Sequence, residues 1–254
     1  MRHGVLVLGL ALLFGCAGAK APPSKNEVIA HTLATTVQLV AERPGGARRS
    51  GSAVLLGGDP HADRRLVLTA HHVLAPEVDQ RLTVHFPNDG RQAEAVLLAS
   101  DPAADLALLA ISDPEIARAQ LRQDAFLGDE VWVVAFPWGR RRTVVKGVVS
   151  QIEAPEGAAG AAAPIDGPVR LIDASISYGM SGGGVFDART GDLLGIVRGY
   201  RTAQLSVQGS DAKPLQVPVA GETTVVSAAR IACFLAASGF PQPVPADAAS
   251  APSC

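Results

Sequence analysis

Short apolar stretches, bounded by turn-forming residues, recur along almost the whole chain, and their lengths are typical of β-strands rather than helices. In the first half strands are predicted for TTVQLV, GSAVLL, RRLVLTA, RLTVHF, RQAEAVLLA and DLALLAI. In the second half they are predicted for VWVVAF, TVVKGVVSQ, VRLIDASI, GGGVFD, LLGIVRGY and LQVPV. Pro44-Gly45-Gly46 and Asn88-Asp89-Gly90 separate neighbouring strands and favour tight turns. The pattern therefore predicts an all-β fold of two packed six-stranded β-barrels.

The barrels are expected to occupy about 28–115 and 116–240, joined by a crossover near 112–130, with a disordered tail over 241–254. EGAAGAAAPIDG, within the second barrel, has the low complexity of a flexible loop.

One segment near the end of the chain, TTVVSAARIACFLAASGF, has helical spacing. Its apolar face would carry Val226, Ala229, Ala232 or Cys233, and Ala236. A C-terminal helix is therefore expected after the second barrel.

The N-terminus has the features of a secretory signal, with a basic Arg2 before an apolar run from Val5 to Phe14 that is too short to span a membrane. Signal peptidase could cut after Ala19. Alternatively Leu13-Phe14-Gly15-Cys16 resembles the bacterial lipobox, in which the cysteine is lipidated and becomes the mature N-terminus. A signal peptide is expected over 1–19, with a possible lipobox that ends at Cys16, and a linker is expected over 20–27. Either interpretation predicts a protein that works in the cell envelope or outside the cell.

Three cysteines are present, and lipidation of Cys16 would leave an even number for an oxidising compartment. Cys233 and Cys254 could then form a disulfide that ties the tail to the domain. Alternatively Cys233 is a buried thiol on the helix and Cys254 is free, because sequence separation does not establish geometry.

Composition and motifs exclude several classes of partner. The net charge of −2 and the 4% of aromatic residues argue against a nucleic-acid surface. Without a C-x-x-C or H-E-x-x-H motif, no zinc site is indicated, and no metal or cofactor is expected. A membrane would be contacted only through the N-terminal lipid anchor.

The segment ISYGMSGGGVFD places Ser181 in a G-x-S-x-G pattern, which is also that of the α/β-hydrolase nucleophile elbow. That elbow requires the order Ser, acid, His, yet all six histidines precede Ser181. Ser181 is also followed by glycines and a predicted strand rather than a helix. The elbow is therefore excluded, and the order His, Asp, Ser remains open.

Candidates for the base and the acid lie at the ends of predicted strands. LVLTAHHVL offers His71 and His72, and SDPAADLALLAI offers Asp101 and Asp105. Asp105 precedes a strongly apolar strand, and a carboxylate buried there needs a partner such as a histidine N–H. Asp101, directly before a proline, fits a turn, and His71 is expected to be structural.

Together the blocks GSAVLL…LVLTAHHVL, SDPAADLALLAI, AFPWGRRRTVVKGVVS and IDASISYGMSGGGVFD resemble those of trypsin-like serine proteases, and are most similar to the bacterial HtrA/Deg branch. The resemblance covers about Val28 to Ala237 and implies a chymotrypsin-like fold. It implies His72 as general base, Asp105 as its orienting acid and Ser181 as nucleophile, with the oxyanion held by the backbone N–H groups of Gly179 and Ser181.

Several positions depart from the family pattern. Met180 stands where the family usually has Asp or Asn, which excludes activation through an ion pair to a freed N-terminus. Gly184 replaces a usual proline, and no PDZ domain is expected to follow the helix. The resemblance places Ser175 at the floor of the substrate pocket and Tyr200 near its wall, so cleavage after Lys or Arg is not favoured.

The function that follows is an extracytoplasmic serine endopeptidase acting on protein or peptide substrates through an acyl-enzyme. Two other functions stay open: a catalytically silent protein of this fold that binds envelope proteins or peptides, and an esterase that uses the same groups.

Overall fold

The computed structural model describes residues 21–59, 61–112, 117–153, 165–205 and 215–242 of the 254-residue chain. The predicted signal peptide, Cys16 and Cys254 lie outside the described residues, as does most of the predicted loop at 156–167 and of the predicted tail.

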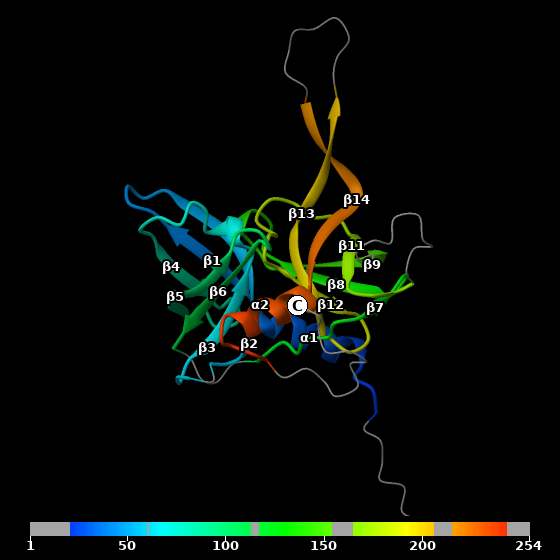
Figure 1. Cartoon of the computed structure of the whole chain (residues 1–254), viewed down its shortest axis with the longest axis horizontal. Coiled ribbons are helices and arrows are strands. Elements are labelled where there is room, and N and C mark those ends of the chain that lie inside the picture. Colours follow the sequence, from blue (N-terminus) through cyan, green and yellow to red (C-terminus); the bar gives the residue numbers. More distant parts are fainter. Residues whose placement is uncertain (1–20, 60, 113–116, 154–164, 206–214, 243–254) are drawn as a thin grey trace, which may run out of the picture.

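Two closed six-stranded antiparallel barrels lie next to each other (Figure 1), which confirms the predicted all-β architecture. Barrel one has the strand order β1-β2-β3-β6-β5-β4. Its strands are β1 (Thr36–Glu42), β2 (Arg48–Gly58), β3 (Arg65–Thr69), β4 (Arg81–His85), β5 (Gln92–Asp101) and β6 (Leu106–Ile111). The turns predicted at Pro44-Gly45-Gly46 and Asn88-Asp89-Gly90 connect β1 to β2 and β4 to β5.

Barrel two has the order β11-β14-β13-β12-β8-β9. Its strands are β8 (Glu130–Ala135), β9 (Thr143–Ile152), β11 (Val169–Asp173), β12 (Gly184–Asp187), β13 (Leu193–Leu205) and β14 (Leu215–Ser227). A separate pair, β7 (Ala125–Phe126) and β10 (Asp166–Gly167), lies beside it, and a short 3₁₀ turn, η2 (Pro137–Gly139), joins β8 to β9.

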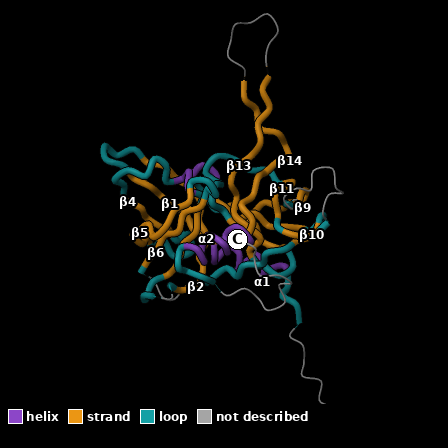
Figure 2. Tube along the Cα trace, viewed as in Figure 1, coloured by secondary structure: helices purple, strands orange, loops and turns teal. Residues whose placement is uncertain are grey.

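Strands β13 and β14 are longer than predicted and project from barrel two as a two-stranded arm (Figures 1 and 2). In the inner part Gly195 pairs with Ser227, and the residues around Ile196 are buried. In the outer part Thr202 pairs with Pro218 and Leu205 with Leu215, and both leucines are exposed. The core therefore supports only the inner part of the arm.

A helix that the sequence did not reveal, α1 (Lys25–Thr35), begins inside the predicted 20–27 linker. Ser24 caps it: its Oγ accepts from the backbone N–H of Glu27, and the Glu27 carboxylate accepts from the backbone N–H of Ser24. This reciprocal capping box satisfies two otherwise unpaired donors of the first turn. The linker prediction was thus too long, because the polar start of this segment is a capped helix end.

The C-terminal helix, α2 (Ala228–Ala237), is confirmed but starts later than predicted. Thr223–Ser227, counted in the predicted helix, are the end of β14. The predicted apolar face was also wrong, since the buried residues of the helix are Ala228, Ile231, Phe234 and Leu235. They pack into the core of barrel one, so α2 fastens the end of barrel two to the other barrel.

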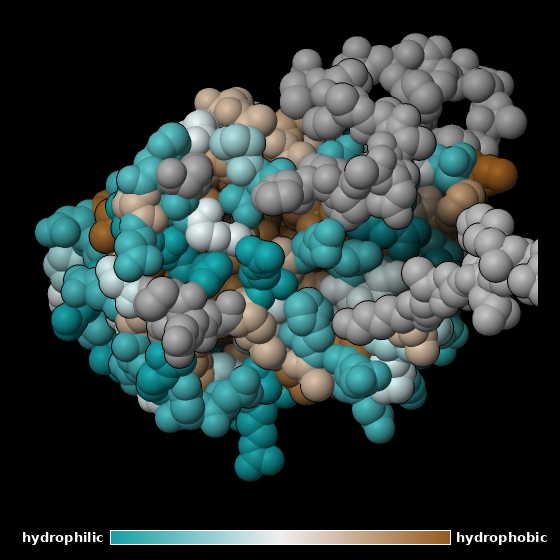
Figure 3. Space-filling view, turned by 90° about the horizontal axis from the view of Figure 1, so that it is seen from below, coloured by the Kyte–Doolittle hydropathy of each residue, from teal (hydrophilic) through white to brown (hydrophobic). Residues whose placement is uncertain are grey.

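Among the described residues no helix is long and apolar enough to cross a bilayer. On the face seen from below, hydrophilic residues predominate among those described, and hydrophobic ones are scattered between them (Figure 3).

Cys233, on α2, is engaged in a disulfide bond. Its pairing with Cys254 stays a prediction, because both other cysteines of the chain lie outside the described residues.

Candidate active site

His72 and Asp105 come together at the end of barrel one that faces barrel two. His72 lies on a 3₁₀ turn, η1 (His71–Val73), directly after β3, and Asp105 directly precedes β6, the strand paired with β3. The ring Nδ1 of His72 lies 2.9 Å from Oδ2 of Asp105 and 3.1 Å from Oδ1. The backbone N–H of His72 also donates to Oδ1, at 3.0 Å. Strand pairing thus brings the two residues together, and two ring contacts fix the orientation of the imidazole.

Asp105 is 7% exposed and has a φ of 59°, a left-handed backbone conformation that Asp tolerates better than most residues. Burial alone would raise the pKa of its carboxyl group. The hydrogen bonds from the ring and backbone of His72, with the nearby charges of His72 and Arg198, outweigh burial and hold the pKa below its ordinary value. Asp105 is therefore a carboxylate at neutral pH and a suitable acceptor for a histidine N–H.

Ser181 lies on the other side of the seam, the boundary between the two barrels, on the barrel-two loop before β12. Gly179 and Gly182 in this loop have φ values of 88° and 80°, in the left-handed region that favours glycine. A Cβ on Gly182 would lie 2.2 Å from the carbonyl oxygen of Ser52 and 2.3 Å from Oγ1 of Thr69. The loop therefore packs directly against the end of β3, the strand that leads to His72.

Ser52, on β2, holds the Ser181 loop from the barrel-one side, a function that the sequence analysis missed. Its backbone N–H donates to the carbonyl of Ser181 at 2.9 Å, and its Oγ donates to the carbonyl of Gly179 at 2.9 Å. The same Oγ accepts from the backbone N–H of Phe136 at 2.9 Å. The only sequence signal was its place in the GSAVLL block.

Met180 also holds this loop, although it cannot form the ion pair of relatives with an acidic residue there. It is 2% exposed and belongs to the apolar core of barrel two. The backbone N–H of Ser177 points at its sulfur, 3.2 Å away, and its own N–H donates to the carbonyl of Ser177 at 3.2 Å. Apolar packing thus occupies the place of a charge pair in this chain.

The backbone N–H groups of Gly179 and Ser181 have no acceptor among the described residues. They are free to donate to an oxygen that arrives from outside, as an oxyanion hole requires. In the same set of residues Ser181 Oγ makes no hydrogen bond, and the contacts of the His72 ring are those with Asp105.

The two predicted pocket residues are both exposed, Ser175 in the segment after β11 and Tyr200 on β13. Two aromatic residues that the sequence did not indicate, Trp138 and Tyr178, lie next to the loop. The rings of Trp138 and Tyr178 are 5.6 Å apart, and the backbone N–H of Trp138 donates to the carbonyl of Tyr178, next to Gly179. Both rings are more than half exposed, which makes them a candidate contact for substrate.

Asp101 and His71, the neighbouring candidates for the acid and the base, make structural contacts rather than contacts with the catalytic candidates. Asp101 accepts hydrogen bonds from the backbone N–H groups of Ala103 and Ala104, which matches the predicted turn. His71 faces Glu77, with Nδ1 3.1 Å from Oε1.

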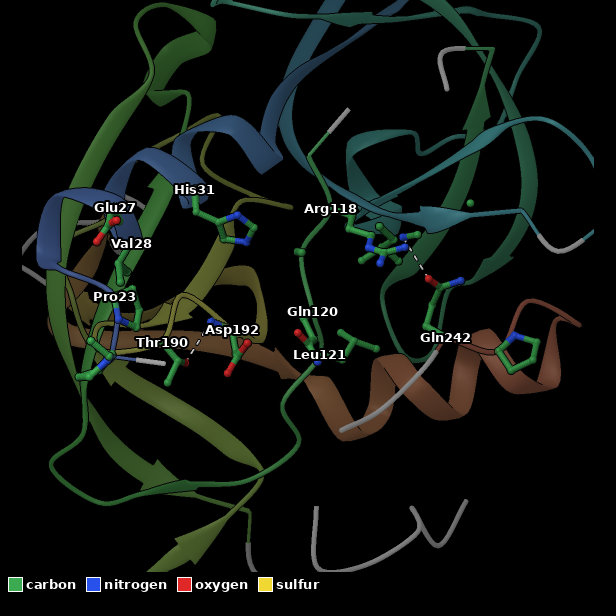
Figure 4. Close-up of a pocket in the computed structure, with 17 residues that line it drawn as sticks. Pro23, Glu27, Val28, His31, Arg118, Gln120, Leu121, Thr190, Asp192 and Gln242 are labelled. Atoms are coloured by element: carbon green, nitrogen blue, oxygen red, sulfur yellow. Dashed lines mark hydrogen bonds between the residues drawn. The ribbon is translucent and has the colours of Figure 1, made fainter. Parts of the chain in front are cut away.

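A cavity of about 1160 Å³ is lined by another set of residues (Figure 4). It is lined by α1 through Glu27, Val28 and His31, by the β12–β13 turn, and by Gln120 and Gln242. None of the candidate catalytic residues contributes to it. Among the described residues there is also no cluster of three or more His, Cys, Asp or Glu side chains that could hold a metal ion.

Comparison with known proteins agrees with this geometry. Residues 51–196 match the family model described as a trypsin-like peptidase domain. The chain is 34% identical over 155 residues, or 58% of its length, to the periplasmic pH-dependent serine endoprotease DegQ of Escherichia coli, and covers 30% of that protein. It is 27% identical over 233 residues to the serine protease PepD of Mycobacterium tuberculosis, covering 87% of this chain and 48% of PepD.

Among solved structures, the serine endoprotease of Yersinia pestis superposes with a TM-score of 0.55 at 26% identity, over 78% of this chain and 64% of that one. The chain spans about a third to a half of the length of the two curated relatives. The family model covers more than half of this sequence, including His72, Asp105 and Ser181. The chain belongs to the trypsin-like peptidase family, and its resemblance to the HtrA/Deg proteases is confirmed.

Proposed function

We propose that this chain is a serine endopeptidase that works outside the cytoplasm. The observation that carries the proposal is the contact between His72 Nδ1 and the carboxylate of Asp105, at the seam where the Ser181 loop packs against β3. The relatives named as periplasmic serine endoproteases and the predicted signal peptide support the location.

In the proposed reaction, Ser181 Oγ attacks the carbonyl carbon of a peptide bond and passes its proton to Nε2 of His72. The oxyanion that forms accepts hydrogen bonds from the N–H groups of Gly179 and Ser181. The leaving amine takes the proton from His72, and an acyl-enzyme remains on Ser181. Water then attacks the ester with His72 as base again, which releases the acid and restores the hydroxyl.

Asp105 acts through the imidazole. Its contact with Nδ1 keeps that nitrogen protonated, so Nε2 is free to accept the serine proton, and its negative charge stabilises the imidazolium that forms. Arg49 supports this turn, since its guanidinium donates to the carbonyl of His72 at 2.8 Å.

The experiment that tests the proposal is labelling of the purified chain with a fluorophosphonate probe. Wild type and Ser238→Ala, a serine at the end of α2, are expected to be labelled, and Ser181→Ala is expected to remain unlabelled. Absence of labelling in the wild type between pH 6 and 9 would contradict an active nucleophile.

A protein of this fold that binds peptides without cleaving them is the second candidate, because Ser181 Oγ makes no hydrogen bond in the described structure. Catalytic hydrogen bonds are often long or poorly aligned in ligand-free sites, so this observation alone does not exclude catalysis. The labelling experiment separates the two. An esterase would also be labelled, and mass spectrometry of a peptide library after incubation distinguishes it, since only an endopeptidase produces new peptide termini.

A further inference from the structure

A second cavity, of about 380 Å³, lies where the loop before β6 of barrel one meets barrel two. Four arginines line it: Arg170 on β11, Arg198 and Arg201 on β13, and Arg230 on α2. The strands β11, β14 and β13 are neighbours in barrel two and lie side by side in Figure 1. The wall on the barrel-one side includes Ala104, the residue directly before Asp105.

The charges of this cavity are not balanced by its own lining. Among the described residues Glu153 is the one acidic residue of the lining, and Arg230 pairs with it at 3.1 Å. Arg201 pairs at 3.3 Å with Glu222, a residue that does not line the cavity. Arg170 has no carboxylate partner among the described residues, and Arg198 has only Asp105, 3.6 Å from its Nε. Three of the four arginines therefore reach a carboxylate, two of them outside the lining, and Arg170 reaches none among the described residues.

We propose that this cavity binds a small multivalent anion bearing phosphate groups, and that Arg198 transmits its binding to Asp105. Guanidinium groups present several N–H donors in a plane that matches the oxygens of a phosphate group. Arginines on three elements that converge on one cavity could contact different oxygens of the same ligand. The ligand would supply the negative charge that the lining lacks.

The coupling rests on the proposed function and follows from the place of Arg198. In the proposed reaction a positive charge develops on the imidazole of His72, and Asp105 stabilises it. Arg198, whose Nε lies 3.6 Å from the same Oδ2 that His72 contacts, opposes this positive charge. An anion that binds Arg198 draws its guanidinium away or neutralises it, so acylation of Ser181 becomes faster.

Binding is tested first, by isothermal titration calorimetry of the full chain with inorganic pyrophosphate at about 0.15 M salt, where exposed charges are screened beyond about 8 Å. Wild type is expected to bind saturably, and Arg170→Glu to bind at least about tenfold more weakly. The matched control is Arg189→Glu. This exposed arginine also lacks an ion-pair partner among the described residues, but it lies on the β12–β13 turn beside the other cavity. Equal weakening by both variants, or no saturable heat in the wild type, would refute the site.

Citrate is titrated as a multivalent anion without phosphorus. Weaker binding of citrate than of pyrophosphate supports the proposed class of ligand. Equal or tighter binding of citrate would overturn that class, because the cavity would then select charge alone.

The coupling is tested by the rate of fluorophosphonate labelling. Pyrophosphate is expected to raise the rate in the wild type by about two- to fivefold, the range for one half-exposed ion pair. Arg198→Ala is expected to label faster without pyrophosphate and not to respond to it, whereas Arg198→Lys, which keeps the charge, is expected to respond. A response that persists in Arg198→Ala would overturn the coupling. Calorimetry does not need a nucleophile, so saturable binding without labelling would refute the proposed enzyme but not the anion site.

Discussion

Barrel one holds His72 and Asp105 through hydrogen bonds between the two residues themselves, whereas barrel two presents Ser181 on a loop shaped by its backbone and by close packing. On the first side the ring and backbone of His72 both contact the carboxylate. On the second side glycines, the buried Met180 and hydrogen bonds from Ser52 determine where Ser181 lies. The His–Asp side should therefore depend on charge, and the Ser181 side on shape.

The largest effect is expected for Gly182→Ala, which tests dependence on shape. Its Cβ would lie 2.2 Å from a backbone oxygen at a φ of 80°, so we expect a loss of about 3–5 kcal/mol of unfolding free energy and no fluorophosphonate labelling. Gly46→Ala is the matched control, since Gly46 has a φ of 83° and nothing within 4 Å of the new Cβ. It should cost about 1–2 kcal/mol and leave labelling intact. Urea unfolding measures both, and similar losses in the two variants would contradict the steric explanation.

Asp105→Asn tests dependence on charge. The amide is similar in shape but cannot stabilise a positive imidazole or keep its correct tautomer, so the labelling rate should fall about 10⁴-fold. Asp101→Asn is the control, because an asparagine oxygen can still accept from Ala103 and Ala104 and should leave the rate unchanged. An Asp105→Asn enzyme within tenfold of wild type would show that charge does not govern this side.

Ser52→Ala addresses the contact between the two sides. Removal of Oγ leaves the carbonyl of Gly179 and the N–H of Phe136 without this partner, at a cost of about 1–3 kcal/mol. We expect labelling to slow about tenfold, because the Gly179 N–H is less well positioned. Ser50→Ala is the comparison, because Ser50 lies on the same strand as Ser52 and its Oγ accepts a hydrogen bond from Gln38 instead. If the two variants label equally fast, Ser52 does not position the loop.

The pH dependence of stability should separate the two sides further. Because the pKa of Asp105 is lower in the folded chain than its ordinary 3.8, its contribution is fully present above that pH and is lost as the pH falls toward the folded value. The stability difference between wild type and Asp105→Asn in urea should therefore shrink in acid. Gly182→Ala keeps this carboxylate, so its deficit relative to wild type should not shrink for this reason.

The smallest effect is expected for Ser24→Ala, which removes the capping box of α1, outside both sides. We expect a loss of about 1 kcal/mol in unfolding free energy and an unchanged labelling rate. A change in labelling would mean that α1 influences the seam. The comparison of the His–Asp side with the Ser181 side would then have to include α1 as a third region.

The sequence was sufficient for much of the fold because strand length and turn residues are local signals. It was insufficient where an apolar run has more than one structural solution. The run from Thr223 to Ser227 reads equally well as helix or strand, and its pairing with β13 decides for strand. The start of α1 was hidden because its polar residues cap a helix rather than form a linker.

For the candidate site, the order of His72, Asp105 and Ser181 and their places at strand ends could be read from the sequence. The contacts of Ser52 and Arg198 could not, because each joins residues that are far apart along the chain and meet only when the barrels pack together.

The arm of β13 and β14 is one uninterrupted pair of strands, yet its two halves have different thermodynamics. The inner residue pairs near Ile196 belong to the core of the protein. The outer pairs near Leu205 form an isolated two-stranded ribbon, and such a ribbon is only marginally stable in water. Amide protons of the inner pairs would exchange with solvent only when the domain unfolds, and those of the outer pairs whenever the ribbon opens locally. The arm can therefore open and close many times during the life of a folded molecule, without any change in the seam that holds Ser181.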